Sequence, residues 1–380
     1  MKGIEPQQPI LLAAYSRVFT GRYQSKIIEV RPEGILIETP VSEGRLVLMG
    51  AGTRLKVTVN SGSEGEQFEA ELLRRSKDDE LMLITRPDLI SRGGRRSEEG
   101  KGARVVALTS GKGGVGKSTL SLNLALELLK QGNRVTVIDA DLGTANLDIM
   151  LGLQVRANLS DVIFAKRDIQ DIVIEGPEGL LLVPGGSGFQ ELTELSDWQF
   201  TRLINSFNYL DRLSDYILLD TGAGLSRNVT NFLLAADQII VVTTPEPHCV
   251  TDAYAIIKVI SELKDDPLRL QLVVNKVENQ REGERVGSKM ADVTEKFLQL
   301  KINYLGSVSD DRAVVRSNKE RRPVVLQRPN ARAAKDIRNL VKGYLLQDES
   351  EEGKRGVVGF LSRFKNLFNN ARESMKHNLN

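Results

Sequence analysis

The sequence predicts an α/β fold, a parallel sheet with helices on both faces, preceded by a small all-β barrel and followed by an amphipathic helix. Three observations support this prediction. Apolar strand-length runs alternate with amphipathic helix-length segments from Arg104 onward, short β-branched runs occupy residues 23–85, and a basic amphipathic segment follows an acidic stretch near the C-terminus. The chain of 380 residues is long enough for one large and one small domain.

Composition and charge exclude several classes of protein. Lysine and arginine total 52 against 50 for aspartate and glutamate, so the net charge of +2 gives no global electrostatic reason to expect a nucleic-acid partner. The single cysteine, Cys249, excludes an internal disulfide and a Cys-x-x-Cys metal or cluster site, which fits a reducing compartment. No signal peptide is seen and no apolar run approaches the ~18 residues of a spanning helix, so we expect a cytoplasmic protein.

The first part of the chain predicts a small antiparallel barrel domain over residues 1–90. Short alternating or β-branched runs there are separated by turn residues, which is the pattern of strands joined by tight connections. The expected strands are Lys26–Val30, Gly34–Glu38, Arg45–Met49, Arg54–Asn60, Phe68–Leu73 and Leu81–Thr85. Residues 91–102 are polar and glycine-rich without apolar periodicity, and we expect a linker there.

The large domain is expected over residues 103–347, where apolar strands alternate with amphipathic helices. Such alternation predicts parallel strands whose crossover helices cover both faces of the sheet. The expected strands are Val105–Leu108, Val135–Ile138, Leu180–Val183, Tyr216–Leu219, Ile239–Val242 and Leu272–Val274. The expected helices are Lys117–Gln131, Trp198–Leu213, Asn228–Ala236, Asp252–Leu263, Gly287–Leu298 and Ala331–Leu346. An acidic linker at residues 348–356 ends the domain.

A glycine-rich segment between the first strand and first helix of this domain carries the strongest chemical signal. It fits G-x-x-x-x-G-K-[ST], in which glycines let backbone N–H groups approach phosphates, Lys117 adds charge and the Ser118 hydroxyl ligates Mg²⁺. The nucleotide-binding residues are Gly111, Lys112, Gly113, Gly114, Val115, Gly116, Lys117, Ser118 and Thr119. The glycines also spell G-x-G-x-x-G, with Asp139 where a dinucleotide fold places a ribose-binding acid, but that fold has no use for Lys117 or Ser118. The sequence therefore predicts a P-loop nucleoside triphosphatase.

Three acidic residues follow predicted strands, at the edge where open α/β sheets bind ligands. Asp139 and Asp141 follow one strand, and Asp220 ends another and leads into a glycine-containing loop. We expect Ser118, Asp139 and Asp220 to hold Mg²⁺, partly through water. Asp141 is better placed to orient the attacking water. The loop after Asp220 would respond to the γ-phosphate.

Lys112 is not required by the general P-loop formula, and it makes the loop resemble the deviant Walker motif of the MinD/ParA family. The resemblance covers residues 103–345. Within that family, the sequence is most similar to the flagellar-number regulators, the FlhG group. The segments that carry it are Asp141–Asp148, Asp220–Gly224 and Thr244–Tyr254. It implies an ATPase in which Lys112 reaches across a nucleotide-sandwiched homodimer to the partner's phosphates, acting in catalysis with Lys117 and Asp141.

The resemblance also implies the cofactors, ATP and Mg²⁺, with Pro245 and Asn275 lining the adenosine pocket. Asn275-Lys276-Val277-Glu278 is one acid short of the guanine-reading N-K-x-D, so GTP stays an alternative. By resemblance, basal activity is weak and the protein regulates flagellar number or placement with flagellar assembly or motility proteins, such as an FlhF-like GTPase or switch-complex proteins. The D-Q-A-x-x-L-R segment by which many members activate FlhF is not seen.

Other functions remain open within the same family. A MinD-type division-site ATPase would share the C-terminal helix, but it does not account for the flagellar-type segments or the barrel. A ParA-like DNA-segregation ATPase would need a basic surface, and nucleic acid is not favoured. The candidate cluster for that surface is Arg312, Arg316, Lys319, Arg321 and Arg322. A metal-cluster carrier of the same fold is excluded because Cys249 stands alone.

The end of the chain predicts an amphipathic helix over residues 357–376, with apolar residues at intervals of three and four and basic or polar residues opposite. A basic helix with three phenylalanines within nine residues is typical of a helix lying in a membrane interface. The membrane-facing residues would be Phe360, Leu361, Phe364, Leu367 and Phe368. The alternative is that this stripe packs on the ATPase domain or on a partner protein. We expect peripheral attachment to the inner face of the cell membrane, strengthened when a dimer presents two helices.

The barrel resembles the N-terminal PilZ-associated domain of flagellar brake proteins, in Tyr23–Val30 and Gly34–Pro40. Arg92 and Arg96 match the R-x-x-x-R half of a cyclic di-GMP site. The partner D/N-x-S-x-x-G is missing, because residues 60–65 place glycine where serine belongs. We therefore expect the barrel to dock the ATPase to motility proteins, and binding of cyclic di-GMP is not favoured.

Overall fold

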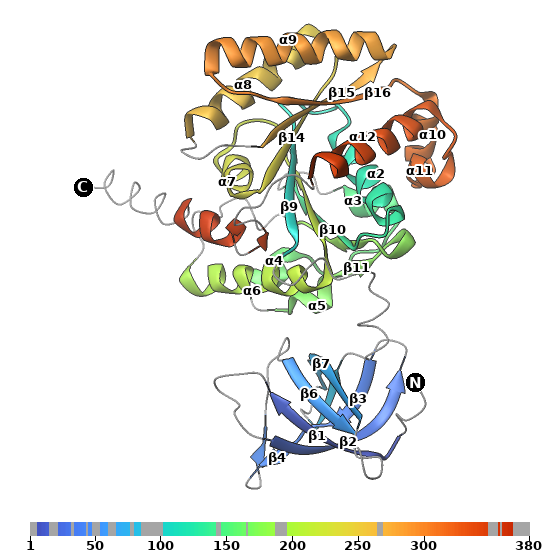
Figure 1. The fold of residues 1–380 in the computed structure, drawn as a ribbon, viewed down its shortest axis with the longest axis vertical. Helices are drawn as coiled ribbons and strands as arrows, with labels where there is room; N and C mark the ends of the chain where they lie inside the picture. Colours follow the sequence, from blue (N-terminus) through green and yellow to red (C-terminus); the bar gives the residue numbers. More distant parts are fainter. Residues whose placement is uncertain are drawn as a thin grey trace, which may run out of the picture. The chain divides into compact units, whose positions relative to one another are not determined.

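The computed structural model describes residues 6–14, 22–31, 34–42, 45–47, 54–59, 66–76, 80–84, 102–141, 146–164, 166–186, 196–263, 269–348, 356–357 and 359–367. The chain forms two compact units, Met1–Arg96 and Ser97–Asn380 (Figure 1). The division falls within the linker expected at residues 91–102, most of which lies outside the described residues. Both halves of the cyclic di-GMP motif, Arg92 with Arg96 and residues 60–65, also lie outside them.

The front unit is a closed barrel of six strands in the order β1-β2-β3-β8-β7-β6. Its strands are β1 (Pro9–Ala14), β2 (Arg22–Arg31), β3 (Gly34–Glu38), β6 (Arg54–Val59), β7 (Glu66–Arg75) and β8 (Leu81–Ile84). Alternate side chains point into the barrel, and Leu12, Ile37, Leu55, Leu72 and Met82 are fully buried there. Closure pairs every strand on both sides, so the barrel has no open edge.

The barrel differs from the sequence-based expectation in two strands. Strand β1 was not expected, because Pro9–Ala14 is a continuous apolar run with two alanines; its pairing with β2 on one side and β6 on the other makes it a strand. The segment expected as a strand at Arg45–Met49 is described only for residues 45–47, and these are not part of the barrel. Among them, β5 (Arg45–Leu46) pairs with β4 (Val41–Ser42) in a separate two-stranded sheet.

The second unit is built on an eight-stranded sheet in the order β11-β12-β10-β13-β9-β14-β15-β16. Its strands are β9 (Arg104–Thr109), β10 (Val135–Ala140), β11 (Ile174–Glu175), β12 (Leu181–Val183), β13 (Tyr216–Thr221), β14 (Gln238–Thr243), β15 (Leu270–Val277) and β16 (Asn303–Ser309). Only the short edge strand β11 is antiparallel to its neighbour. The six expected strands are confirmed. The edge strands β11 and β16 were not expected, because neither is a buried apolar run.

Helices cover both faces of this sheet (Figure 1). They are α2 (Lys117–Lys130), α3 (Leu147–Leu151), α4 (Leu159–Ile163), α5 (Ile169–Ile172), the short 3₁₀ turn η1 (Pro177–Gly179), α6 (Asp197–Leu213), α7 (Arg227–Ala235), α8 (Pro247–Leu263), α9 (Gln280–Leu298), α10 (Arg312–Lys319), α11 (Val324–Gln327) and α12 (Arg332–Asp348). Alternation along β9 shows the two layers: Val105 and Ala107 join the core with α4 to α9, whereas Val106 and Leu108 join the core with α2, α3, α11 and α12.

Helix α9 begins seven residues earlier than the sequence suggested, at Gln280 instead of Gly287. Gly283 and Gly287 lie inside the helix, where a methyl group would collide with Ser307 and Tyr304 of β16. These glycines therefore permit close packing of α9 on the sheet and do not stop the helix.

The C-terminal segment differs most from expectation. Residues 359–367 are helical as predicted, but their apolar side chains are not free for a membrane. Phe360 is fully buried, and Phe364 and Leu361 are 3% and 8% exposed, because they join the core beside α6 and α7 (Figure 1). Leu367 packs against the same core, and Phe368 lies outside the described residues. Within the described part of the chain, no helix is long and apolar enough to cross a membrane.

Candidate functional site

The predicted phosphate loop connects β9 to α2, at the carboxyl edge of the sheet. Gly116 has φ +93°, a left-handed conformation that favours glycine, and a methyl group there would also collide with the Asn275 amide. That amide donates to the Val115 carbonyl at 2.7 Å, and the Lys276 ammonium donates to the Gly114 carbonyl, also at 2.7 Å. Strand β15 therefore fixes the loop from outside, through two residues that are about 160 positions away in the chain.

Helix α2 begins immediately after the loop, with Gly116 as its N-cap and no side chain capping the first turn. The first N–H groups of a helix have no intrahelical acceptor, and together with the helix dipole they favour an anion. The Lys117 ammonium lies at the same end, 2.8 Å from an oxygen of Asp220, and the two side chains are only 6% and 1% exposed. This end of α2 is therefore suited to bind phosphate.

The strand register brings two of the predicted acids together. Asp139 of β10 lies directly across from Asp220 of β13, and β13 neighbours β9, which leads into the loop. Burial raises the pKa of both carboxyl groups. For Asp220, the charge and hydrogen bond of Lys117 oppose that increase. For Asp139, the increase reaches about 7, opposed by the Leu147 N–H and assisted by the charge of Asp220.

Asp139 was expected to help hold Mg²⁺, and in this structure its carboxylate is bonded to backbone N–H groups. One of its oxygens accepts hydrogen bonds from the N–H groups of Asn146 and Leu147, at 2.9 and 3.2 Å, and the other accepts from the Asp141 N–H at 3.2 Å. Both oxygens therefore accept hydrogen bonds from the backbone of described residues on either side of residues 142–145. The expected role of Asp139 at Mg²⁺ stays a prediction.

Ser118 and Asp220 fit a magnesium ion that arrives with a nucleotide. Across the described residues, no group of three or more His, Cys, Asp or Glu side chains could hold a metal by itself. Mg²⁺ at nucleotide sites takes one or two protein ligands and completes its shell with phosphate oxygens and water. The hydroxyl of Ser118 and the carboxylate of Asp220 would supply that share, and the ion would neutralise phosphate charge.

The loop after β13 is tied to the phosphate loop. The Thr221 hydroxyl donates to the Leu108 carbonyl at 2.8 Å, and the Gly224 N–H donates to the Ser110 carbonyl at 3.0 Å. Asp141 lies beside this loop, since a methyl group on Gly222 would be 3.5 Å from its carboxylate. A change in the conformation of the phosphate loop can therefore be transmitted to the loop after β13 through these two hydrogen bonds.

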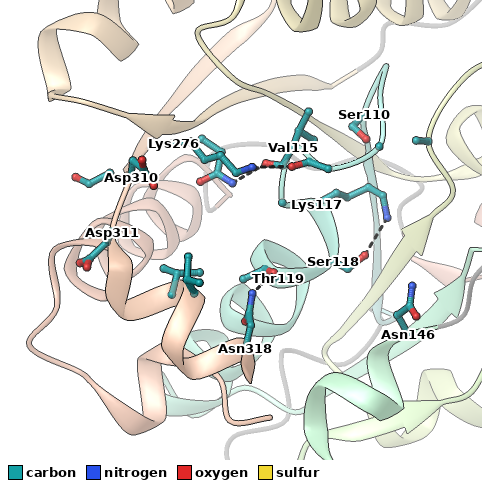
Figure 2. Close-up of a pocket in the computed structure, with 18 of the residues that line it drawn as sticks. Ser110, Val115, Lys117, Ser118, Thr119, Asn146, Lys276, Asp310, Asp311 and Asn318 are labelled. Carbon is teal, nitrogen blue, oxygen red and sulfur yellow. Dashed lines mark hydrogen bonds between the residues drawn. The ribbon is translucent and has the colours of Figure 1, made fainter. Parts of the chain in front are cut away.

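A cavity of about 460 Å³ lies over the phosphate loop (Figure 2). Its inner side contains the predicted residues Lys117, Ser118, Thr119 and Asp141. Its outer side comes from elements that the sequence did not connect with the site: the end of β16 and helix α10. The lining residues from these elements are Ser309, Asp310, Asp311, Val314, Val315 and Asn318. Asn318 also donates to the Thr119 hydroxyl at 3.1 Å, so α10 is bonded to α2 across the cavity.

The sequence contains only a weak indication of the outer side of the cavity. Asp310 and Asp311 follow a strand as the other site acids do, but β16 was hidden by its glycine and polar residues. Pro245 is not among the residues that line the cavity, whereas Asn275 is. Glu278 is exposed and is also absent from the lining.

Lys112 behaves differently from the rest of the loop. It is exposed, and it is absent from the cavity lining, whereas Gly113 to Thr119 all line it. Its backbone is held by the Ser110 hydroxyl, which donates to the Lys112 carbonyl at 3.0 Å. The phosphate loop thus carries one buried lysine, Lys117, and one exposed lysine, Lys112.

Two family models match the chain, one in each unit. Residues 103–274 match the model described as an AAA domain, and residues 5–87 match the model described as Flagellar protein YcgR. Antiactivator FleN of Pseudomonas aeruginosa is 37% identical over 232 residues, which are 61% of this chain and 82% of FleN. Flagellum site-determining protein YlxH of Helicobacter pylori is 35% identical over 294 residues, which are 76% of this chain and 96% of YlxH.

Solved structures share the fold of the second unit. The MinC:MinD cell division protein complex of Aquifex aeolicus contains a chain with a TM-score of 0.52 and 26% identity, covering 67% of this chain and 99% of that one. The septum site-determining protein MinD of Pyrococcus horikoshii, complexed with Mg-ADP, has a TM-score of 0.54 and 24% identity, covering 66% of this chain and 100% of that one.

Proposed function

The chain belongs to the MinD/ParA family of P-loop ATPases, and from this premise we propose that it dimerises on ATP, cycles on the membrane and regulates flagellar number or placement. The observation that carries the proposal is the contrast between its two loop lysines. Lys117 is 6% exposed and paired inside the site, whereas Lys112 is exposed on the same loop. A second subunit facing the loop would receive the Lys112 ammonium at its own phosphates.

Hydrolysis is then coupled to assembly. Phosphoryl transfer is accelerated chiefly by positioning and by positive charge near the transferred group, and a cation supplied by a partner acts like an arginine finger. Asp141 lines the cavity beside the loop after β13, where a carboxylate can orient the attacking water. A monomer lacks a partner's Lys112 at its phosphates, which explains the weak basal activity that we expect.

Membrane attachment requires release of the C-terminal helix. Its apolar side chains, among them Phe360 and Phe364, are buried against α6 and α7. An amphipathic helix can bury its apolar face in only one place at a time, in the protein or in the bilayer interface. We therefore propose that the structure corresponds to the detached state, and that dimerisation on ATP favours the released one.

The flagellar role is supported by both units. YlxH is named as a flagellum site-determining protein, FleN is named as an antiactivator, and the model that matches residues 5–87 is described as a flagellar protein. A division-site role explains the ATPase unit but not the barrel. We propose that the barrel docks the ATPase to flagellar assembly or motility proteins on the inner face of the cell membrane.

Dimerisation is tested by light scattering after gel filtration. Asp141→Ala protein should be a dimer with Mg-ATP and a monomer with ADP, and adding Lys112→Ala should return it to a monomer. Lys166→Ala, which changes an exposed lysine away from the cavity, is the control. A dimer that persists without Lys112 would refute the role of that lysine in trans.

Membrane and flagellar roles need separate assays. Sedimentation with anionic vesicles should show more bound protein with ATP than with ADP or without nucleotide. Cells that carry Lys117→Ala should have an altered number or position of flagella with normal division sites. Minicells with normal flagella would instead support a division-site role.

A further inference from the structure

The buried C-terminal helix, residues 356–357 and 359–367 and hereafter the tail helix, occupies a defined site on the second unit. Its apolar contacts form a row of aromatic rings. The Phe360 ring lies 4.9 Å from that of Phe207 in α6, and the Phe364 ring lies 5.2 Å from that of Phe232 in α7. Ring separations in this range are favourable beyond the burial of area. The tail helix is thus held between α6 and α7 by specific packing.

A buried carboxylate accepts hydrogen bonds from polar groups of the tail helix. Asp237 has a side chain that is 2% exposed, and one of its oxygens accepts from the Arg363 guanidinium at 2.6 Å. The other oxygen accepts from the Gly356 N–H at 3.1 Å and from the Val105 N–H at 2.9 Å. Arg363 also donates to the Ala235 carbonyl at 2.9 Å. One acid therefore bonds to the start and to the middle of the tail helix and to β9, the strand that leads to the phosphate loop.

Besides α6 and α7, the tail helix contacts the end of the linker from the front domain. Gly102 is the first described residue after the interdomain linker, and Ala103 follows it with its N–H 2.5 Å from an oxygen of Asp211 in α6. Gly356 has φ +99°, and a methyl group on it would be 3.0 to 3.1 Å from the backbone of Gly102. The start of the tail helix and the end of the linker are therefore in direct contact, backbone against backbone.

Helices α6 and α7 and residues 102–105 form a helix-binding site that the tail helix occupies, and we propose that the linker from the front domain controls its occupancy. The ligand is an amphipathic helix with a glycine at its start and an arginine seven residues later. When residues 102–103 move, Gly356 loses its contact with the backbone of Gly102, and Asp237 is no longer positioned to bond to the tail helix. The tail helix is then released. The functional consequence, control of membrane attachment from the barrel, rests on the proposed function; the site itself does not.

The physical basis is linkage through shared contacts. Asp237 bonds to Val105 and to the tail helix with the same oxygen, so a shift of one donor changes the geometry available to the other. Coupling of this kind is reciprocal. Pulling on the linker weakens binding of the tail helix, and removing the tail helix loosens residues 102–105.

Hydrogen exchange of the full chain without lipid or nucleotide tests the coupling. Asp211→Ala removes the acceptor of the Ala103 N–H, whereas Asp211→Asn keeps an acceptor oxygen and serves as the matched control. We expect exchange of residues 359–367 to rise about 10-fold in Asp211→Ala, the effect of losing one good hydrogen bond, and to change little in Asp211→Asn. A rise confined to residues 102–105 would overturn the proposal.

The reciprocal variant is Gly356→Ala, which acts on the tail side. Its expected result is faster exchange at Ala103 and Val105, which the substitution does not touch chemically. Gly179→Ala, also at a positive φ but with nothing within 4 Å, controls for backbone strain. Unchanged exchange at residues 102–105 with a released tail helix would show that the two segments are independent and would refute the coupling.

Vesicle sedimentation of the same variants separates this inference from the proposed function. Faster exchange of the tail helix without vesicle binding would leave the helix-binding site intact and refute membrane cycling. ATP-dependent vesicle binding that is identical in Asp211→Ala and wild type, with unchanged exchange, would refute control by the linker and leave membrane cycling intact.

Discussion

Replacing Asp139 by asparagine should flatten the pH dependence of stability of the second unit. Burial raises the folded-state pKa of Asp139 from 3.8 to about 7, so between those values the folded protein binds a proton that the unfolded chain releases. A raised carboxyl pKa contributes stability that is fully present below the unfolded value and is lost as the pH rises through the folded value. Each pH unit inside that window removes about 1.4 kcal/mol.

The size of this change in stability depends on how much of the interval from pH 3.8 to about 7 lies within the pH range of the measurement. From pH 5 to pH 8, about two pH units lie below the folded pKa, so Asp139 costs the folded state about 2.7 kcal/mol over the range. Asparagine has the shape of the protonated acid and does not titrate. The difference in unfolding free energy between Asp139→Asn and wild type should therefore move by about 2.7 kcal/mol in favour of asparagine.

Urea unfolding at pH 5, 6, 7 and 8 provides the measurement. Trp198 is the only tryptophan in the chain and lies at the start of α6, so its fluorescence reports on the second unit and not on the barrel. Titrating groups that do not interact with Asp139 affect both proteins equally and cancel in the difference, so the coupled Asp220 is the one neighbour whose titration can differ. A difference that stays constant from pH 5 to pH 8 would show that Asp139 is ionised throughout and would refute its description as a buried, partly protonated carboxyl group.

Three further predictions concern the nucleotide site and the tail helix. Gly116→Ala should lower affinity for a fluorescent ATP analogue by at least ~10-fold, because φ +93° is strained for alanine and its methyl group meets Asn275, whereas Gly132→Ala, at φ +88° with open space around it, should not. Asn318→Ala should raise the Kd for ATP about 3- to 10-fold with kcat at saturation unchanged, since one hydrogen bond to Thr119 is lost; an unaltered Kd would exclude a role for α10. Phe364→Glu should release the tail helix in hydrogen exchange, because an unpaired carboxylate is not tolerated beside Phe232, and the exposed Lys365→Glu should leave it bound.

The barrel and the sheet show which strands a sequence can reveal. Buried central strands such as β9 and β13 are recognisable because burial on both faces requires continuous apolar runs. Edge strands do not have this requirement: β16 carries a glycine and polar residues, and it was missed together with the outer side of the cavity. Strand β1 was missed for the opposite reason, since its apolar run has no alternation and only pairing on two sides makes it a strand.

The candidate site also has a part that the sequence predicted and a part that it did not. The phosphate loop was predicted residue by residue because its chemistry is local: glycines, Lys117 and Ser118 are neighbours in sequence and act together. The partners that hold the loop were not predicted, because Asn275 and Lys276 reach it from about 160 residues away and Asn318 from about 200. Asp139 was expected at the metal, which stays a prediction, and its hydrogen bonds from the N–H groups of Asp141, Asn146 and Leu147 were not predicted because they depend on which N–H groups face its oxygens.

By itself the sequence determined the two units, the helical character of the C-terminus and the position of Lys112 beside the phosphate loop, because each is written in residues close together along the chain. Only the tertiary structure decided where the apolar face of the tail helix lies. Periodicity shows that such a face must be buried, but membrane, partner and protein core satisfy that requirement equally. The choice is made by Phe207, Phe232 and Asp237, which come together only when the chain is folded.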